Sequence, residues 1–422
     1  MAKLISAAAL AALLLATVIP AQGTADPEAR ALWITRFDYT EPDHVRAIVE
    51  NAASLNFNIL LFQVRGNGTV FYPSEIEPWA WELTSDGPET TGQDPGWDPL
   101  ALAIEEAHAR GLELHAYMNF FPAWRTQNYP PRDSGQLWWE HPDWFMCDSS
   151  GRRMIPRDTA VPYSSPVYGG PLDNVSREAP PGDWYAFISP GVPEVQDYLA
   201  SVFEEVAANY EIDGIHFDYI RYPAEIREVT QGYGERVREL GNWSYDPVSL
   251  ARFQHETGLL APDASPEAWI QWRCDQITAT VRKIRERVDA VHPGLMLTAA
   301  LMPNPQDAHD NNNQDYLTWM EEGLLDGAVT MGYTASSELF RTRTANLMGQ
   351  RPSQGYVIPG LSLGNGPGPA ITEIEIAREL GGDGWAGFAY ASLFDREGGH
   401  VRRPLADALA EGPLAEPAPR PW

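Results

Sequence analysis

The segment DGIHFDYIR places a histidine and an aspartate at alternate positions of an apolar run, a spacing that could carry acid–base chemistry. Because side chains alternate along a strand, His216 and Asp218 would share one face, while Ile215 and Phe217 share the other. The apolar face suits packing against helices, so Asp218 would point inward at the end of the strand. Burying a carboxylate is costly unless it is paired or catalytic. We therefore expect Asp218 to be catalytic, with an ion pair to Arg221 as the structural alternative.

Polar residues also end other apolar runs. The same alternation places Gln63 and Arg65 on one face of FNILLFQVR, and His115 and Asn119 on one face of LELHAYMNF. Several polar side chains that converge from different strands favour a binding site over isolated loop anchors. The predicted substrate-binding residues are Arg36, Gln63, Arg65, His115, Asn119, His216, Arg221 and Tyr333.

Glycoside hydrolysis is the chemistry that suits this set. It commonly uses one carboxylic acid as proton donor and a second carboxylate as nucleophile or base. Asp218 is the first carboxylate. The second remains open among Asp38 after the first strand, Glu75 and Glu82 after the second, and Asp395 after the eighth. Asp38 and Glu75 complete the predicted catalytic set.

Metal- and cofactor-dependent chemistry has weaker support in the sequence. HExxH and CxxC motifs are absent from it, and His115 and His216 are explained more simply as buried, hydrogen-bonded histidines. The oxygen-rich stretch 307–315 lacks the glycine and the terminal glutamate of an EF-hand loop. We therefore predict neither a metal nor a cofactor.

These residues need a scaffold that brings strand ends together. Short apolar runs alternate with amphipathic stretches, which is typical of a parallel sheet, and eight such units favour a closed (β/α)8 barrel over an open sheet. In that fold, active sites lie at the carboxyl ends of the strands. The predicted strands are 31–37, 57–65, 112–120, 212–219, 295–301, 328–333, 356–363 and 385–390, with helices at 43–55, 99–110, 192–209, 315–323, 338–348 and 371–380.

Two connections are unusually long, and connections of this length are commonly functional. Residues 121–190 follow the third strand and are rich in Trp, Pro and Tyr, whereas residues 223–293 follow the fourth strand and have mostly helical patterns. Both insertions should form sides of the same cleft at the carboxyl ends of the strands. We expect a single α/β TIM-barrel domain over residues 26–422 that carries these two insertions.

The net charge argues against nucleic-acid binding, and the N-terminal segment indicates an exported protein. The net charge is −28, from 30 basic and 58 acidic residues, so the chain repels phosphates. Residues 1–25 have the pattern of a signal peptide, and no second apolar run predicts a membrane span after its cleavage. We expect a periplasmic or extracellular protein, in which Cys147 and Cys274 either form a disulfide or stay free.

The motifs and their order resemble bacterial glycosyl hydrolase-like family 10, which is distinct from the family 10 xylanases. The resemblance covers residues 31 to about 392 and rests on ALWITRF, LNFNILLFQVR, YPSEIEPWA, DPGWDPLALAIEEAHARGLELHAYMNF, SPGVPEVQDYL, YEIDGIHFDYIRYP and QDYLTWMEEGLLDGAVTMGY. It implies an export signal and a barrel fold, and some members of the family cleave the glycan strands of peptidoglycan.

The family motifs map onto three predicted strand ends. The FQVR motif maps to residues 62–65, the HAWxN-type motif to 115–119 and the DGIHFDD motif to 213–219, where Tyr219 replaces the second aspartate of many relatives. By parity, Tyr219 faces away from Asp218. The replacement therefore puts in doubt only a mechanism that uses both positions.

Three functions are consistent with these features. The first is an exported glycosidase that acts on a polysaccharide, peptidoglycan first, in which Arg36 or Arg65 binds the lactyl carboxylate of muramic acid. The second is a carbohydrate-binding barrel without catalysis, which Tyr219 and the open identity of the second acid favour. The third is a metal-assisted deacetylase or esterase.

Overall fold

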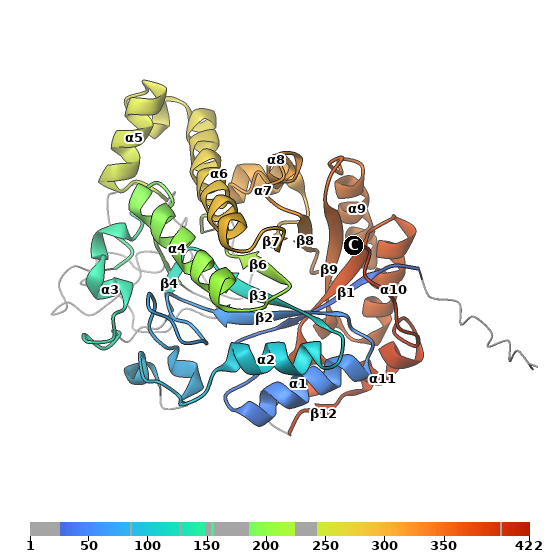
Figure 1. The fold of residues 1–422 in the computed structure, drawn as a ribbon. Coiled ribbons are helices and arrows are strands. Elements are labelled where there is room, and N and C mark those ends of the chain that lie inside the picture. The colour runs from blue at the N-terminus through green and yellow to red at the C-terminus, as the bar shows by residue number, and fades with distance from the viewer. Residues whose placement is uncertain are drawn as a thin grey trace, which may run out of the picture.

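The computed structural model describes residues 26–84, 87–125, 129–147, 153–155, 185–223, 243–396 and 399–422. Within these ranges, eight parallel strands close into a barrel in the order β1, β2, β3, β6, β7, β8, β9 and β10, with helices around it (Figure 1). The predicted (β/α)8 barrel is confirmed, and every predicted strand overlaps an observed one. The barrel strands are β1 (Ala29–Ile34), β2 (Ile59–Arg65), β3 (Glu113–Asn119), β6 (Gly214–Asp218), β7 (Met296–Leu301), β8 (Gly327–Met331), β9 (Tyr356–Ser362) and β10 (Gly384–Phe388).

The helices begin and end where local signals predict. Asp98 caps α2 by accepting a hydrogen bond from the backbone N–H of Ala101 at 3.0 Å, and Pro99 takes the first helical position. Gly111, which follows the helix, has a φ of 72°, which glycine adopts without strain. The predicted helices correspond to α1 (Pro42–Ser54), α2 (Pro99–His108), α4 (Pro193–Asn209), α8 (Tyr316–Glu321), α9 (Ser337–Met348) and α10 (Pro367–Glu379), and further helices are α3 (Leu137–Glu140), α5 (Pro247–Thr257), α6 (Pro266–Val291), α7 (Pro305–Asn312) and α11 (Pro404–Glu411).

Alternation along the strands divides the core into two layers. Outward-facing residues of β2 such as Leu60 and Phe62 pack against the helices, whereas Leu61 faces the barrel interior. Trp33 is buried in that interior, and Gly360 makes room for it, because a Cβ at residue 360 would lie 2.9 Å from the indole ring. The inward-facing layer therefore fills the barrel below its mouth.

Both long connections follow the carboxyl ends of barrel strands, as predicted. In the first, β4 (Pro122–Trp124) and β5 (Ala186–Phe187) pair as a short antiparallel sheet. In the second, α5 and α6 extend beyond the ring of helices (Figure 1) and share a small core of Phe253, Trp269 and Trp272. The rest of these insertions, at residues 126–128, 148–152, 156–184 and 224–242, lies outside the described part of the chain.

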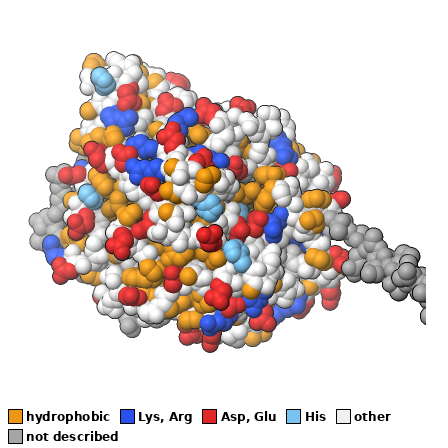
Figure 2. Space-filling model, in the orientation of Figure 1, with side chains coloured by type: hydrophobic (Ala, Val, Ile, Leu, Met, Phe, Trp, Pro, Cys, Tyr) orange, Lys and Arg blue, Asp and Glu red, His pale blue; other side chains and the backbone are white. Residues whose placement is uncertain are grey.

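Export stays a prediction, whereas the structure bears on the membrane-span and cysteine predictions. The signal-like residues 1–25 lie outside the described residues. Among the helices that the structure describes, none combines the length and the apolar character that a membrane crossing requires. Cys147 and Cys274 are both buried and are not joined by a disulfide, so the alternative without a disulfide is confirmed. On the face in Figure 2, acidic and basic side chains are interspersed.

Candidate active site

Asp218 ends β6 at the carboxyl-terminal mouth of the barrel, where it is 7% exposed. The Tyr117 hydroxyl donates a hydrogen bond to one carboxylate oxygen at 2.7 Å. The other oxygen accepts hydrogen bonds from the backbone N–H of Tyr219 at 2.6 Å and from Arg221 Nη1 at 3.4 Å. Three donors around a nearly buried carboxylate stabilise its negative charge. Asp218 therefore has the ion pair with Arg221 that the structural alternative predicts. It also has the position at the barrel mouth that a catalytic role requires.

The turn after Asp218 explains how the carboxylate is held. Tyr219 has a φ of 49°, in the left-handed region that bulky residues rarely adopt. This conformation brings the N–H of Tyr219 onto the preceding carboxylate. The Tyr219 ring packs against Tyr185 with a centroid distance of 5.0 Å, and the Arg221 guanidinium lies 4.4 Å from the Tyr219 ring centroid. Strain of this kind persists where the surroundings over-determine it, often at functional sites.

Two tyrosine hydroxyls beside Asp218 stay protonated. Burial, with the negative charge of Asp218, raises the pKa of Tyr117 well above its ordinary value. Burial and the same carboxylate also raise the pKa of Tyr333, which lies after the end of β8. Both phenols are therefore neutral at physiological pH and can donate hydrogen bonds at the mouth. The charge of Asp218 is thus one of the causes that keep the predicted Tyr333 in its neutral form.

Gln63 and Asn119 join the ends of β1, β2 and β3. Gln63 Oε1 accepts a hydrogen bond from the backbone N–H of Arg36 at 3.0 Å, and Gln63 Nε2 donates to Asn119 Oδ1 at 3.4 Å. Asn119 Nδ2 donates to the Gly66 carbonyl at 2.8 Å, and Asn119 is the register partner of Asp218. The structure thus brings both predicted amides to the mouth. Their polar atoms hold the loops around Asp218.

Arg36 lies at the mouth between β1 and the first insertion. Its Nε donates to Glu82 at 3.0 Å, its Nη2 donates to the Tyr185 hydroxyl at 2.9 Å, and its guanidinium lies over the Phe37 ring. Burial lowers the pKa of Arg36, but Tyr185 and Glu82 outweigh this effect and raise it, so the charge persists. The sequence did not predict Tyr185, because it belongs to a long connection without periodic pattern.

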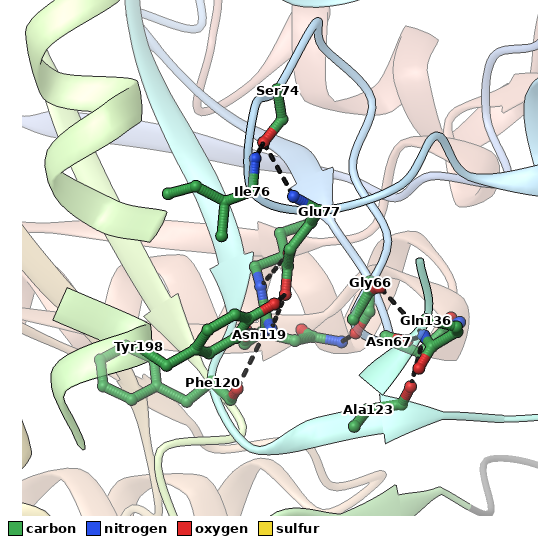
Figure 3. A network of polar contacts seen from close by, with 12 residues as sticks. Gly66, Asn67, Ser74, Ile76, Glu77, Asn119, Phe120, Ala123, Gln136 and Tyr198 are labelled. Atoms are coloured by element: carbon green, nitrogen blue, oxygen red, sulfur yellow. Dashed lines mark hydrogen bonds and ion pairs between the residues drawn. The ribbon is translucent and has the colours of Figure 1, made fainter. Parts of the chain in front are cut away.

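Arg65 does not face the mouth, which corrects the parity prediction. The β2–β3 pairing shifts register just before it, so Arg65 pairs with the outward-facing Met118. Its guanidinium contacts both oxygens of Glu77, at 2.7 and 2.5 Å, and donates to the Phe120 carbonyl at 2.8 Å. Glu77 also accepts a hydrogen bond from the Tyr198 hydroxyl of α4, so the pair lies between barrel and helix (Figure 3). A fully buried arginine with these partners does not bind substrate.

The predicted His115 and His216 face the barrel interior but lie below the mouth. His115 Nε2 contacts Glu113, the first residue of β3, at 3.3 Å. His216 Nε2 accepts a hydrogen bond from Trp33 Nε1 at 3.0 Å, so its proton is on Nδ1, which donates to Thr298 at 2.9 Å. Burial, with a smaller effect of His115, lowers the pKa of His216 to about 3 and keeps the ring neutral. These contacts with other protein groups do not favour the predicted role of the two histidines in substrate binding, because parity gives the face and not the depth.

Two of the second-acid candidates have other partners. Asp38 turns back onto β1 and accepts hydrogen bonds from the backbone N–H and the hydroxyl of Thr35, at 2.6 and 2.8 Å. Burial raises the pKa of Asp38. Glu75 is exposed, and its backbone N–H donates to Glu205 of α4 at 2.7 Å, which places it outside the barrel. This position does not favour the predicted catalytic role of Glu75.

The other two candidates differ in their link to Asp218. Asp395 lies 3.6 Å from Arg403 at a hairpin of β11 (Phe394–Asp395) and β12 (Val401–Arg402). Glu82 is buried, and its contact with Arg36 connects it to the cluster around Asp218. Of the four acids, Glu82 is the one that shares a hydrogen-bonded network with the mouth.

The segment 360–364 reads GLSLG, so the expectation that the chain has no GxSxG pattern of serine hydrolases is wrong. In a nucleophile elbow, the serine sits on a sharp, strained turn between strand and helix. Ser362 instead has φ −88° and ψ 112°, which is ordinary extended backbone, and no described histidine bonds to it. In the same part of the chain, no group of three or more His, Cys, Asp or Glu is arranged to hold a metal ion.

Comparison with known sequences gives a consistent family. The family model described as glycosyl hydrolase-like 10 matches residues 28–162 and 182–354. Glycosyl hydrolase DigH of Escherichia coli strain K12 is 25% identical over 303 residues, which cover 66% of this chain and 55% of DigH. Glycosyl hydrolase YngK of Bacillus subtilis strain 168 is 25% identical over 334 residues, which cover 72% of this chain and 54% of YngK. The chain spans about half the length of these relatives.

Comparison with solved structures supports the barrel. The PgaB glycoside hydrolase domain of Bordetella bronchiseptica aligns with a TM-score of 0.59 at 13% identity, covering 91% of this chain and 98% of that domain. The catalytic domain of beta-amylase from Paenibacillus polymyxa aligns with a TM-score of 0.55 at 12% identity, covering 94% and 100%. At these identities, the likeness shows the fold alone.

Proposed function

The chain belongs to the glycosyl hydrolase-like 10 family, and from this premise we propose that it is an exported glycosidase that cleaves the glycan strands of peptidoglycan. The observation that carries the proposal is the Asp218 carboxylate, held by three donors at the mouth of a closed barrel. Active sites of this fold lie at that end of the strands. The proposed export, to the periplasm or beyond the cell, rests on the signal-like residues 1–25.

Asp218 suits the carboxylate that reacts in its charged form. In glycoside hydrolysis, this group attacks the sugar or activates a water molecule, while a second acid protonates the leaving oxygen. Tyr117 and the N–H of Tyr219 each bind one oxygen of Asp218, which fixes its orientation. A proton donor is favoured by apolar surroundings instead. We therefore assign Asp218 to the nucleophile or base, with Tyr117 as the residue that orients it.

Arg36 is suited to an anionic substituent of the substrate. Glu82 binds Nε and Tyr185 binds Nη2, which leaves Nη1 without a partner among the residues that the structure describes. The guanidinium geometry matches a carboxylate, such as the lactyl group of muramic acid. Glu82 would then hold Arg36 in place through its 3.0 Å hydrogen bond to Nε.

Reducing-end release tests the proposal. The substrates are purified peptidoglycan glycan strands, with and without stem peptides, and chitin oligosaccharides, which share the backbone but lack the lactyl group. We expect cleavage of the glycan strands in preference to chitin, and a loss of about 10²–10⁴-fold in Asp218→Asn. Glu211→Gln, at an exposed glutamate before β6, is the matched control and should retain full activity.

The same assay separates the second candidate, a carbohydrate-binding barrel without catalysis. That candidate is favoured by the contacts of Asp38, Glu75 and Asp395, none of which reaches Asp218. Saturable glycan binding by the wild type with no reducing ends after long incubation would support it and overturn the glycosidase. Equal turnover by wild type and Asp218→Asn would remove Asp218 from the mechanism.

A further inference from the structure

Phe388 is an exposed aromatic ring at the mouth of the barrel. It ends β10, and 36% of its surface is exposed. Among the large apolar side chains that the described residues expose, the only other aromatic ring is Phe37, just past the end of β1. Leaving apolar surface in water forgoes about 25 cal/mol per Å² of burial. An exposed ring beside a polar cluster is therefore a candidate contact for a ligand.

The Phe388 ring packs against two aromatic residues, the half-buried Tyr333 and the buried Trp33. Tyr333 stacks on it with a centroid distance of 5.1 Å and an interplanar angle of 28°, and Trp33 meets it edge-on at 5.9 Å. Trp33 is itself held by its hydrogen bond to His216. Because these supports hold the ring before any ligand arrives, little conformational entropy is lost on binding.

Barrel topology places Phe388 across the mouth from Asp218. Three strands separate β6 from β10 in either direction around the closed sheet, so the two strands are opposite each other. Tyr333 follows β8, which lies between them on one side. The Asp218 charge contributes to the raised pKa of Tyr333, which agrees with a short path across the mouth. A sugar in the mouth would therefore have the carboxylate on one side and the aromatic ring on the other.

Phe37 differs from Phe388 in what covers its ring. The guanidinium groups of Arg36 and Arg125 lie 4.4 and 4.9 Å from the Phe37 ring centroid. These cations occupy positions over the π-system that a sugar ring would need. Phe37 is therefore a support for arginine side chains, and it offers a control residue of the same type and similar exposure at 40%.

We infer that Phe388, supported by Tyr333, is a stacking platform for the pyranose ring that lies against Asp218, an inference that rests on the proposed function. The faces of a pyranose with equatorial substituents present polarised C–H groups, and the negative face of an aromatic ring attracts them. The platform selects sugars of this configuration, such as β-linked glucosamine derivatives. An axial hydroxyl on the stacked face would interrupt the contact.

Binding measured without turnover tests this platform. The ligand is chitotetraose, a β-linked N-acetylglucosamine tetrasaccharide without lactyl groups, so that Arg36 and its support Phe37 have no anion to bind. It is titrated calorimetrically into the full chain carrying Asp218→Asn. Adding Phe388→Leu, which keeps an apolar side chain but loses the planar face, should weaken binding and raise Kd by about 3–10-fold. Adding Phe388→Trp should retain the affinity of the parent, and Phe37→Leu should change Kd less than Phe388→Leu.

The outcomes separate this inference from the proposed function. Because the readout is Kd in the Asp218→Asn background, the dependence on Phe388 would stand even if the wild type never cleaved the glycan. Unchanged affinity in Phe388→Leu, an equal loss in Phe37→Leu, or no binding by the parent variant would each overturn the platform. Thermal midpoints within error of the parent exclude misfolding, and Phe388→Trp gives the answer if Phe388→Leu fails to fold.

Discussion

Two buried arginine–glutamate pairs lie near neighbouring strand ends, yet only one of them borders the candidate active site. Arg65 and Glu77 form a two-bond pair between the barrel and α4. Arg36 and Glu82 share a single bond of 3.0 Å, and another guanidinium nitrogen of Arg36 reaches Tyr185 at the mouth. The chemistry of the two pairs is the same. They differ in where the remaining donors of each arginine point.

An arginine at the end of a barrel strand is therefore not by itself a substrate-binding residue. Arg65 donates to the carbonyls of Asn119 and Phe120, and the N–H of Phe120 in turn donates to the Asp218 carbonyl at 2.8 Å. Arg65 thus fixes the strand beside the catalytic one. Arg36 keeps one nitrogen, Nη1, without a partner among the described residues.

A third buried glutamate lacks an arginine altogether. Glu373 lies in α10, and neither of its carboxylate oxygens has a hydrogen-bond partner among the described residues. Burial raises the pKa of Glu373 to about 7. The three glutamates therefore form a series, from Glu77 with two bonds to its arginine, through Glu82 with one, to Glu373 with none.

Removing Glu77 should have the largest effect on stability. Glu77→Ala leaves the charge of Arg65 buried and unpaired, which costs about 3–5 kcal/mol of unfolding free energy. Denaturant unfolding measures this cost. The double variant Arg65→Met with Glu77→Leu removes both charges and should recover much of the loss. A Glu77→Ala protein as stable as wild type would show that the pair does not hold these strands.

Changing Glu82 should have a smaller effect on stability and a selective effect on substrate. Glu82→Gln keeps an acceptor for Arg36 but weakens a charge-assisted hydrogen bond, so we expect a loss of about 1–2 kcal/mol. Because Arg36 is then less firmly placed, KM should rise for glycan strands that carry lactyl groups and stay unchanged for chitin oligosaccharides. Equal changes in KM for both substrates would contradict the role of Arg36 in binding an anion.

Glu373 should make stability depend on pH. Between pH 4.5, the ordinary pKa of glutamate, and its folded pKa of about 7, the folded chain holds more protons at this residue than the unfolded chain. Stability contributed by this residue is therefore highest below the unfolded pKa and falls as pH rises through the folded pKa.

Thermal unfolding at pH 5 and pH 8 measures this effect. Glu373→Gln should be more stable than wild type at pH 8, by about 1 kcal/mol, and the difference should be smaller at pH 5. Glu375→Gln, at an exposed position of the same helix, is the control and should follow wild type. A wild-type pH slope in Glu373→Gln would mean that another group titrates.

The fold could be predicted because its signals are local. Apolar runs and caps such as Asp98 depend on a few neighbouring residues. The strands therefore lie where the sequence predicts them. Parity also placed Gln63, Asn119 and Asp218 correctly on the inward face, because β2 pairs with β3 in one register up to Gln63 and β3 and β6 pair without interruption. These predictions needed no knowledge of partners distant in the sequence.

The predictions that failed depend on contacts between segments. Arg65 left the inward face because of a register shift, which arises only when β2 pairs with β3. His115 has the predicted face but lies at the wrong depth, next to the start of its strand. The contact of Arg36 with Glu82 spans 46 residues, and its contact with Tyr185 spans 149. No periodic pattern in the sequence records such contacts.

We propose that the carboxylate of Asp218 is the nucleophile or base of the reaction, and the turnover of Asp218→Asn tests this most directly. Asparagine keeps the size of the side chain and an acceptor for Tyr117, but it can neither attack the sugar nor take a proton from water. With purified glycan strands, we expect a rate at least about 100-fold below wild type with an unchanged thermal midpoint. Release of reducing ends at the wild-type rate would contradict it.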